Sequence, residues 1–132
     1  MDTMGECGDV RWRAYSLADL GKAYRRLGNA AAAAERLRSA IDIMNNIGDL
    51  RWAAVTRIRL GDIYRSATQS AEADVEYMKA AELFNELADP VWGARALVSR
   101  ALVAIDESCL DKAMEPMQHW TADIHSTELE SR

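Results

Sequence analysis

The chain repeats itself around the stretch Gly48-Asp49-Leu50-Arg51-Trp52-Ala53-Ala54. Forty residues earlier the sequence reads Gly8-Asp9-Val10-Arg11-Trp12-Arg13-Ala14, and forty residues later, more loosely, Ala88-Asp89-Pro90-Val91-Trp92-Gly93-Ala94. A fixed period of this size is typical of helical repeat arrays, in which each unit buries its apolar face against the next. The recurrence predicts an all-α chain of three antiparallel helix hairpins, about six helices, with repeats near 9–47, 48–87 and 88–125.

Composition agrees with one helical domain. Of the 132 residues, 49% are hydrophobic, and there are only two prolines and seven glycines. Residues 1–8 lack periodicity and are expected to be a short leader, and residues 126–132 form a polar tail that should fray. The predicted domain therefore covers residues 9–125.

The helix boundaries follow from capping chemistry. Asp9, Asp49 and Asp89 are expected N-caps, because a carboxylate can accept a backbone N–H from the first turn. Gly48 can adopt the left-handed conformation that ends a helix, and Pro90 suits the first helical position.

The last repeat is harder to divide. We expect a fifth helix over 91–105, a turn at 106–108 and a sixth helix from about Cys109. Pro116 would kink or restart that sixth helix, because proline removes a backbone donor and clashes with the preceding turn.

The motif Leu-Gly-x-x-Tyr is followed by one alanine twelve residues after the glycine and by another alanine seven residues later. The matching residues are Leu20, Gly21, Tyr24, Ala33 and Ala40 in the first repeat, and Leu60, Gly61, Tyr64, Ala73 and Ala80 in the second. This pattern resembles the tetratricopeptide (TPR) consensus, and the resemblance implies a right-handed superhelix of helix hairpins. The large residue that the consensus has between its two alanines is present as Leu37 and Tyr77.

The period of forty exceeds the usual TPR period of about thirty-four. Such long units resemble those of Leu-Gly-Asn-repeat adaptors and of the C-terminal arrays in actinobacterial transcriptional regulators of the antibiotic-regulatory-protein type. The third repeat is degenerate, since Arg100, Ala101 and Ala104 occupy the Leu, Gly and Tyr positions. HEAT or armadillo repeats share the period but do not explain the Leu-Gly-x-x-Tyr spacing.

Packing roles follow from the repeat. Gly21 and Gly61 should mark close crossings of the two helices in a hairpin. The motif residues Leu and Tyr should fill the space between hairpins; these are Leu20, Tyr24, Leu60 and Tyr64. Trp12, Trp52 and Trp92 share one phase of the repeat, which favours packing between hairpins over ligand binding. Replacing a buried tryptophan such as Trp52 with alanine would cost roughly 3–5 kcal/mol.

The net charge of −5 argues against general nucleic-acid binding. The charge is uneven: residues 1–66 hold 11 basic and 8 acidic residues, net +3, and residues 67–132 hold 5 and 13, net −8. This gradient either steers a partner or reflects two differently decorated solvent faces. Cys7 and Cys109 have no paired spacing, and the sequence has no signal core or membrane-length apolar run, so a cytoplasmic protein without membrane contact is expected.

In TPR proteins the first helix of each hairpin lines a concave groove. Transferred to this chain, the groove positions are Tyr15, Ala18, Lys22, Arg25 and Arg26; Val55, Ile58, Arg59, Asp62 and Arg65; and Arg95, Val98, Ser99, Leu102 and Ile105. The residues expected to bind a partner are Tyr15, Lys22, Arg25, Arg26, Val55, Ile58, Arg59, Arg65 and Arg95. A basic, partly apolar groove predicts an acidic peptide or protein segment as ligand. The alternative is that these arginines are simply solvated.

A carboxylate clamp for chaperone tails is disfavoured, because Lys22 and Arg59 stand where that clamp needs asparagines. Catalysis has no support either. His119 and His125 are six residues apart rather than the three or four that suit metal ligation on a helix. No phosphate-binding loop is present, so neither an enzyme, a metal nor a cofactor is expected.

These observations predict a protein- or peptide-binding module, either an adaptor or a regulatory domain such as that of a larger transcriptional regulator. Two alternatives stay open. One is a self-association module whose terminal hairpins stack on other copies to give a homo-oligomer. The other is a sensory domain for a small signalling ligand, which would need an enclosed pocket.

Overall fold

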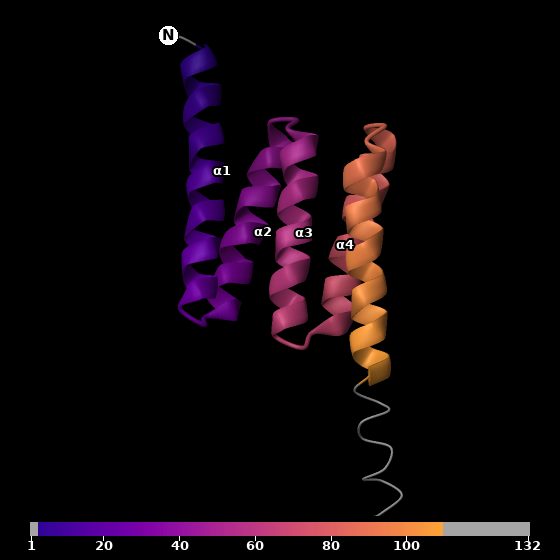
Figure 1. Ribbon diagram of the computed structural model, residues 1–132. Coiled ribbons are helices and arrows are strands. Elements are labelled where there is room, and N and C mark those ends of the chain that lie inside the picture. The colour runs from indigo at the N-terminus through magenta and orange to yellow at the C-terminus, as the bar shows by residue number, and fades with distance from the viewer. Residues whose placement is uncertain (1–2, 110–132) are drawn as a thin grey trace, which may run out of the picture.

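The computed structural model describes residues 3–109, with side chains from residue 9 onward. This part of the chain is all-α. Its helices are α1 (Thr3–Arg26), α2 (Ala30–Asn46), α3 (Leu50–Ser66) and α4 (Ser70–Glu86), followed by helical residues 90–109 (Figure 1). The predicted sixth helix, the kink at Pro116 and the polar tail lie outside the described residues.

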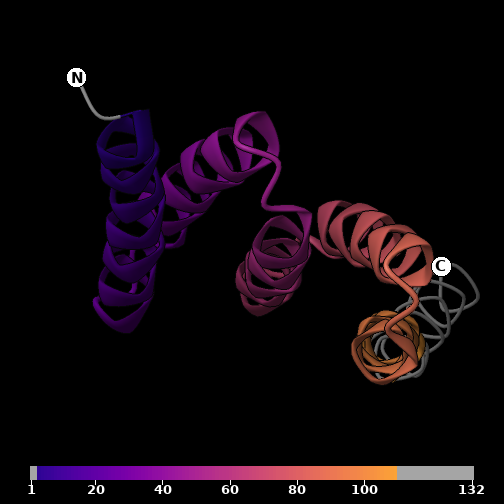
Figure 2. The same cartoon turned by 90° about the horizontal axis from the view of Figure 1, so that it is seen from above.

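The helices form stacked antiparallel hairpins. Seen from above, α3 and residues 90–109 lie along one side, α2 and α4 lie along the other, and α1 lies at one end of the row (Figure 2). Each helix packs mainly against its neighbours in the chain. The predicted helical repeat architecture is confirmed for two complete hairpins and for the first helix of a third.

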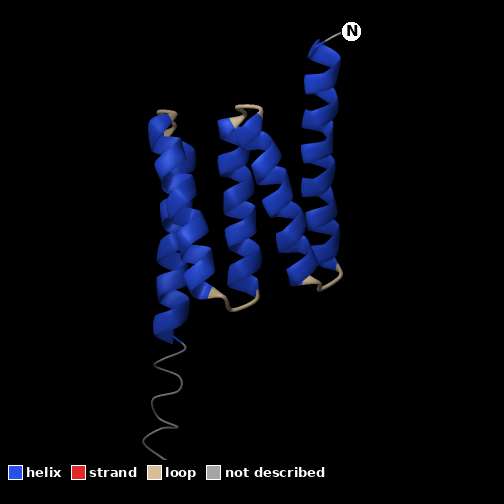
Figure 3. Cartoon of the chain, turned by 180° about the vertical axis from the view of Figure 1, so that it is seen from behind, coloured by secondary structure: helices blue, strands red, loops and turns tan. Residues whose placement is uncertain are grey.

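Short loops with regular capping connect the helices (Figure 3). Gly28 and Gly48 take positive φ angles of 82° and 80°, as expected of residues that end helices. Asp49 accepts the N–H of Trp52 at 3.4 Å, and Asp89 accepts the N–H of Trp92 at 3.2 Å. The predicted N-caps at both aspartates are therefore confirmed, and Pro90 is the first helical residue after Asp89, as expected.

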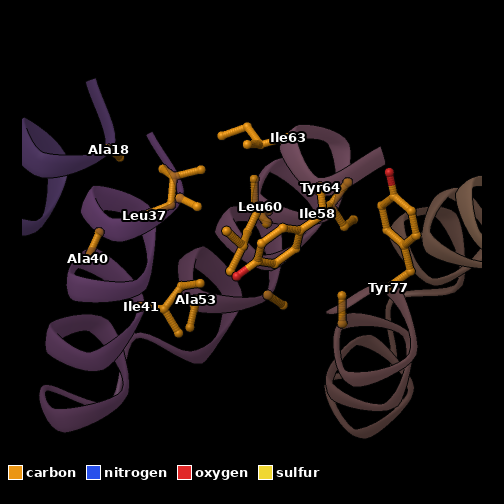
Figure 4. Packing of buried hydrophobic residues seen from close by; sticks show 14 of the residues in the cluster. Ala18, Leu37, Ala40, Ile41, Ala53, Ile58, Leu60, Ile63, Tyr64 and Tyr77 are labelled. Carbon is orange, nitrogen blue, oxygen red and sulfur yellow. The ribbon is translucent and has the colours of Figure 1, made fainter. Parts of the chain in front are cut away.

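The predicted close crossings are confirmed at both motif glycines. A Cβ added to Gly21 would lie 2.9 Å from Leu37 Cδ2, and one added to Gly61 would lie 2.6 Å from Tyr77 Cε1. Figure 4 shows Leu37 of α2 lying between Ala18 of α1 and the side chains of α3. Each motif glycine leaves space that the large side chain of the partner helix fills. This packing explains why a large residue follows the Leu-Gly-x-x-Tyr motif in both repeats.

Two predicted boundaries are wrong. α1 begins at Thr3, so most of the expected leader is helical and Asp9 lies inside the helix rather than at its N-cap. No proline interrupts residues 3–9, and extending a formed helix costs little. Residues 106–108 are helical rather than a turn. Neither glycine nor proline occurs there, and the Asp106 carboxylate binds Arg65 instead of capping a helix.

The inter-hairpin role predicted for Leu20 is also wrong. Leu60 is 1% exposed, because α2 covers its face of α3, whereas Leu20 is 46% exposed on α1. No described helix precedes α1 to cover the equivalent face. Tyr64 is buried as expected, and Tyr24 is half-buried.

Over the described part of the chain, no helix combines the length and the apolar character that crossing a membrane requires.

Candidate interaction groove

Side chains of α1, α2, α3 and residues 90–109 line a cleft of about 560 Å³. Cationic side chains from α1, α3 and residues 90–109 surround it. Its lining consists of Lys22, Arg25, Arg26, Leu37, Arg59, Asp62, Ile63 and Arg95. The structure therefore gathers five of the nine expected binding residues around one cleft.

The cations of the cleft differ from most other arginines of the described chain. Five ion pairs form between described residues, and they use Arg11, Arg51, Arg57, Arg65 and Arg100. None of the five cleft cations takes part in them. Their positive charge is concentrated at the cleft and is only partly offset by the one carboxylate of the lining, Asp62, which favours an anionic partner.

The single carboxylate of the cleft is already engaged. Asp62 accepts a hydrogen bond from the Tyr77 hydroxyl at 2.5 Å. Burial and this hydrogen bond to Asp62 raise the pKa of Tyr77, so the phenol remains a neutral donor. Asp62 is thereby held against α4, while Leu37 and Ile63 supply the apolar part of the lining.

Arg65 is one of the expected binding residues, but it does not line the cleft. Its guanidinium contacts the Asp106 carboxylate through two hydrogen bonds, Nε–Oδ2 at 2.5 Å and Nη2–Oδ1 at 3.2 Å. The hydrogen bonds from Arg65 lower the pKa of Asp106 and raise the pKa of Arg65. One repeat earlier, Arg25 matches Arg65 and Ser66 matches Asp106. Arg25 has no equivalent carboxylate, so it stays unpaired among the described residues.

Three of the expected groove positions are buried instead of exposed. Val55 and Ile58 are 8% and 3% exposed and belong to the core, as does Ala18 at 5%. The positions lie on the expected helices, but their short apolar side chains are covered by neighbouring helices. From α1 and α3 the cleft lining takes mainly charged side chains, with Ile63 as the one apolar residue.

The remaining groove positions lie outside the cleft lining. Val98, Leu102 and Ile105 are exposed on residues 90–109, and Ser99 is half-buried there. Arg95 does line the cleft, and its guanidinium carbon lies 4.9 Å from the centre of the Trp92 ring. This cation–π contact positions Arg95 without neutralising its charge.

The three repeated tryptophans have different environments. Trp92 is half-buried and stacks on the buried Phe84, with ring centres 5.7 Å apart, which agrees with the predicted packing role. Trp12 and Trp52 are 70% and 42% exposed, so full burial between hairpins is wrong for both. Trp52 nevertheless touches the previous hairpin, because its ring centre lies 5.7 Å from that of Tyr15.

Tyr15 does not line the cleft. It lies between Trp12, at 6.1 Å in an edge-to-face arrangement, and Trp52. The sequence offered a signal for this cluster, since Tyr15 follows Trp12 by one helical turn and Trp52 repeats Trp12. The exposure of the cluster has no signal in the sequence, because the shared repeat phase of the tryptophans does not give them a shared environment.

Among the described residues, no group of three or more His, Cys, Asp or Glu side chains could hold a metal ion. His119 and His125 lie outside this part of the chain.

A protein-family model described as "Soluble NSF attachment protein, SNAP" matches residues 4–128. The chain belongs to the soluble NSF attachment protein (SNAP) family. The SNAP match spans all three expected repeats and supports a TPR-like helical repeat and a protein-interaction adaptor module. It offers indirect support for a non-enzymatic role. No curated protein in the comparison matches the chain.

Proposed function

We propose that this SNAP-family chain is an adaptor that binds an acidic segment of a partner protein in the cleft between α1, α3 and residues 90–109. The observation that carries the proposal is the convergence of five cations, unpaired among the described residues, on one cleft. The name of the family describes an attachment protein, which fits a function based on binding other proteins.

The chemistry of the lining favours carboxylates. Arginine presents a planar fork of donors that matches a carboxylate with two parallel hydrogen bonds. The cleft supplies Arg25 and Arg26 from α1, Arg59 from α3 and Arg95 from the next helical segment. A segment with several Asp or Glu residues can therefore engage three helices at once.

The same lining speaks against a sensory pocket for a small signalling molecule. Such pockets are mostly apolar with a few polar groups, whereas only Leu37 and Ile63 are apolar here. An extended or helical acidic segment fits a charged, open surface better.

The test uses fluorescein-labelled deca-glutamate and deca-glutamine peptides, titrated by fluorescence anisotropy at low salt. We expect the glutamate peptide alone to bind, with an affinity that falls as salt rises. The Arg25→Glu/Arg59→Glu variant should lose about tenfold or more in affinity, since two charge-assisted contacts become repulsive.

The matched control is Arg13→Glu/Lys79→Glu, which changes the net charge equally at exposed residues that do not line the cleft. It should retain most of the affinity. Equal losses in the two variants, or no binding of deca-glutamate, would overturn the proposal.

Self-association is the second candidate, and one observation favours it. Leu20 of α1 and Leu27 of the following turn are 46% and 80% exposed, whereas α2 packs against α3, the counterpart of α1 in the next hairpin. Light scattering across concentration tests this function: a concentration-dependent mass that Leu20→Glu abolishes supports it, and a constant monomer mass removes it.

A further inference from the structure

Trp12, Tyr15 and Trp52 form an aromatic shelf on the first two hairpins. Tyr15 contacts Trp12 at 6.1 Å and Trp52 at 5.7 Å between ring centres. Trp12 and Trp52 keep 70% and 42% of their surface exposed, and Tyr15 is half-buried between them. Large aromatic surface that stays open to water is a common anchor for partner side chains.

The shelf and the basic cleft lie along the same helices. Tyr15 precedes Lys22 by seven residues on α1, and Trp52 precedes Arg59 by seven residues on α3. Seven residues are close to two full helical turns, so both pairs share a helix face and are separated by about 10 Å along the axis. α1 and α3 run in the same direction (Figure 1). The aromatic residues Tyr15 and Trp52 are in contact, and the cations Lys22 and Arg59 line the same cleft.

The third tryptophan shows why the shelf is confined to these hairpins. Trp92 stacks on Phe84 and lies under the guanidinium of Arg95. With these two contacts, the Trp92 side chain is half-buried. Among the described residues, Tyr15 is the one aromatic neighbour of Trp12 and Trp52, and both tryptophans keep exposed surface that a ligand can contact.

We propose that the acidic segment bound in the cleft also carries one aromatic or large aliphatic residue that packs on the shelf. This inference rests on the proposed function and specifies the partner further. A distance of about 10 Å corresponds to roughly three residues of extended chain or about seven residues of helix. The partner motif is therefore a cluster of carboxylates with one apolar anchor at a defined distance to one side.

The experiment uses two fluorescein-labelled peptides that place tryptophan three or seven residues before a Glu-Glu-Glu block, with serine or alanine spacers. Each has a partner peptide in which alanine replaces the tryptophan. At one of the two spacings, the tryptophan peptide should bind about tenfold tighter than its alanine partner, since an aromatic contact adds to the buried area.

The protein variants locate the gain. The advantage of tryptophan should disappear in Trp52→Ala and shrink in Trp12→Ala, whose highly exposed side chain can be removed without disturbing the core. It should persist in Lys79→Glu, which lies on α4 away from the shelf. Circular dichroism of each variant confirms that the helices are retained.

The outcomes separate the two proposals. If the acidic peptides bind and tryptophan adds nothing at either spacing, the shelf is overturned and the adaptor function stands. The shelf is also overturned if the advantage survives in both tryptophan variants. If no acidic peptide binds, the proposed function fails and this inference fails with it.

Discussion

Arg65 of α3 and Asp106 of the next hairpin, 41 residues apart in the sequence, are joined by two hydrogen bonds between guanidinium and carboxylate. The pair turns a residue expected in the binding groove into a link between hairpins. Its repeat counterpart, Arg25 opposite Ser66, lacks the acid and keeps its charge for the cleft. One substitution between repeats thus separates a structural arginine from a candidate binding arginine.

The Arg65–Asp106 pair predicts a pH-dependent contribution to stability. The folded pKa of Asp106 is lowered by Arg65, so the contribution is present above the unfolded pKa of about 3.9 and is lost as pH falls through the folded value. The side chains are 34% and 46% exposed, so the effect should be small and weaker in salt. Thermal melts of wild type and Asp106→Asn should differ at pH 7 and converge in acid. A difference that stays constant down to pH about 2 would contradict the assignment.

Ser66→Asp should convert Arg25 into a second structural arginine. The new carboxylate occupies the position of Asp106 in the following repeat, so it should pair with Arg25 and withdraw that charge from the cleft. Affinity for deca-glutamate, measured by anisotropy, should fall several-fold without loss of helix content. Ser66→Asn, which is similar in shape but neutral, is the control and should bind like wild type. Unchanged affinity in Ser66→Asp would argue against a role for Arg25.

Gly61→Ala should destabilise the second hairpin. The added Cβ would lie 2.6 Å from Tyr77 Cε1, and a ring held by the Asp62 hydrogen bond cannot move aside easily. Overpacking costs about 1–3 kcal/mol and the better helix propensity of alanine offsets about 1, so we expect a net loss of up to about 2 kcal/mol in urea unfolding.

Gly21→Ala is the matched control in the first hairpin. Its Cβ would meet the flexible end of Leu37 at 2.9 Å, so the change should be nearly neutral. Tyr77→Leu, which copies the Gly21–Leu37 pair, should partly rescue Gly61→Ala. Equal losses of unfolding free energy at both glycines would show that the contact between the added Cβ and the Tyr77 ring is not the cause.

Two aromatic truncations should differ in cost. Phe84 is 0% exposed, so Phe84→Ala should lower the free energy of unfolding by about 3–5 kcal/mol, as for other core aromatics. Trp52 is 42% exposed, and Trp52→Ala should cost only about 1–2 kcal/mol, because much of the ring is already in water. Urea denaturation of the two variants measures the difference. Similar losses would indicate that Trp52 is a packing residue after all.

The repeat architecture could be predicted because capping and close packing leave local signals. Asp49 and Asp89 behave as the caps that their positions imply, and Gly21 and Gly61 receive the large side chains that the spacing requires. These relationships depend on residues within one hairpin or one turn. The period of forty residues therefore predicts most of the observed helix arrangement.

The errors arise where equivalent residues have different neighbours. Leu20 and Leu60 share a motif position, yet only Leu60 is covered by a preceding hairpin. Val55 is on the groove-lining helix but is too short to emerge from the core. Arg65 is paired with Asp106, a long-range partner for which the sequence pattern predicts a turn instead of a helix. Exposure and pairing between hairpins are properties of the stack, and a motif within one repeat does not encode them.

The dominance of packing between consecutive helices has a kinetic consequence. Because most contacts join segments close in sequence, little chain must be closed into large loops before stabilising contacts form. Folding should be fast and should spread from hairpin to hairpin. Backbone amides of α2 and α3, which both have helices packed on two sides, should exchange with deuterium more slowly than those of α1. The chain is then a gradient of local stabilities rather than one uniform block.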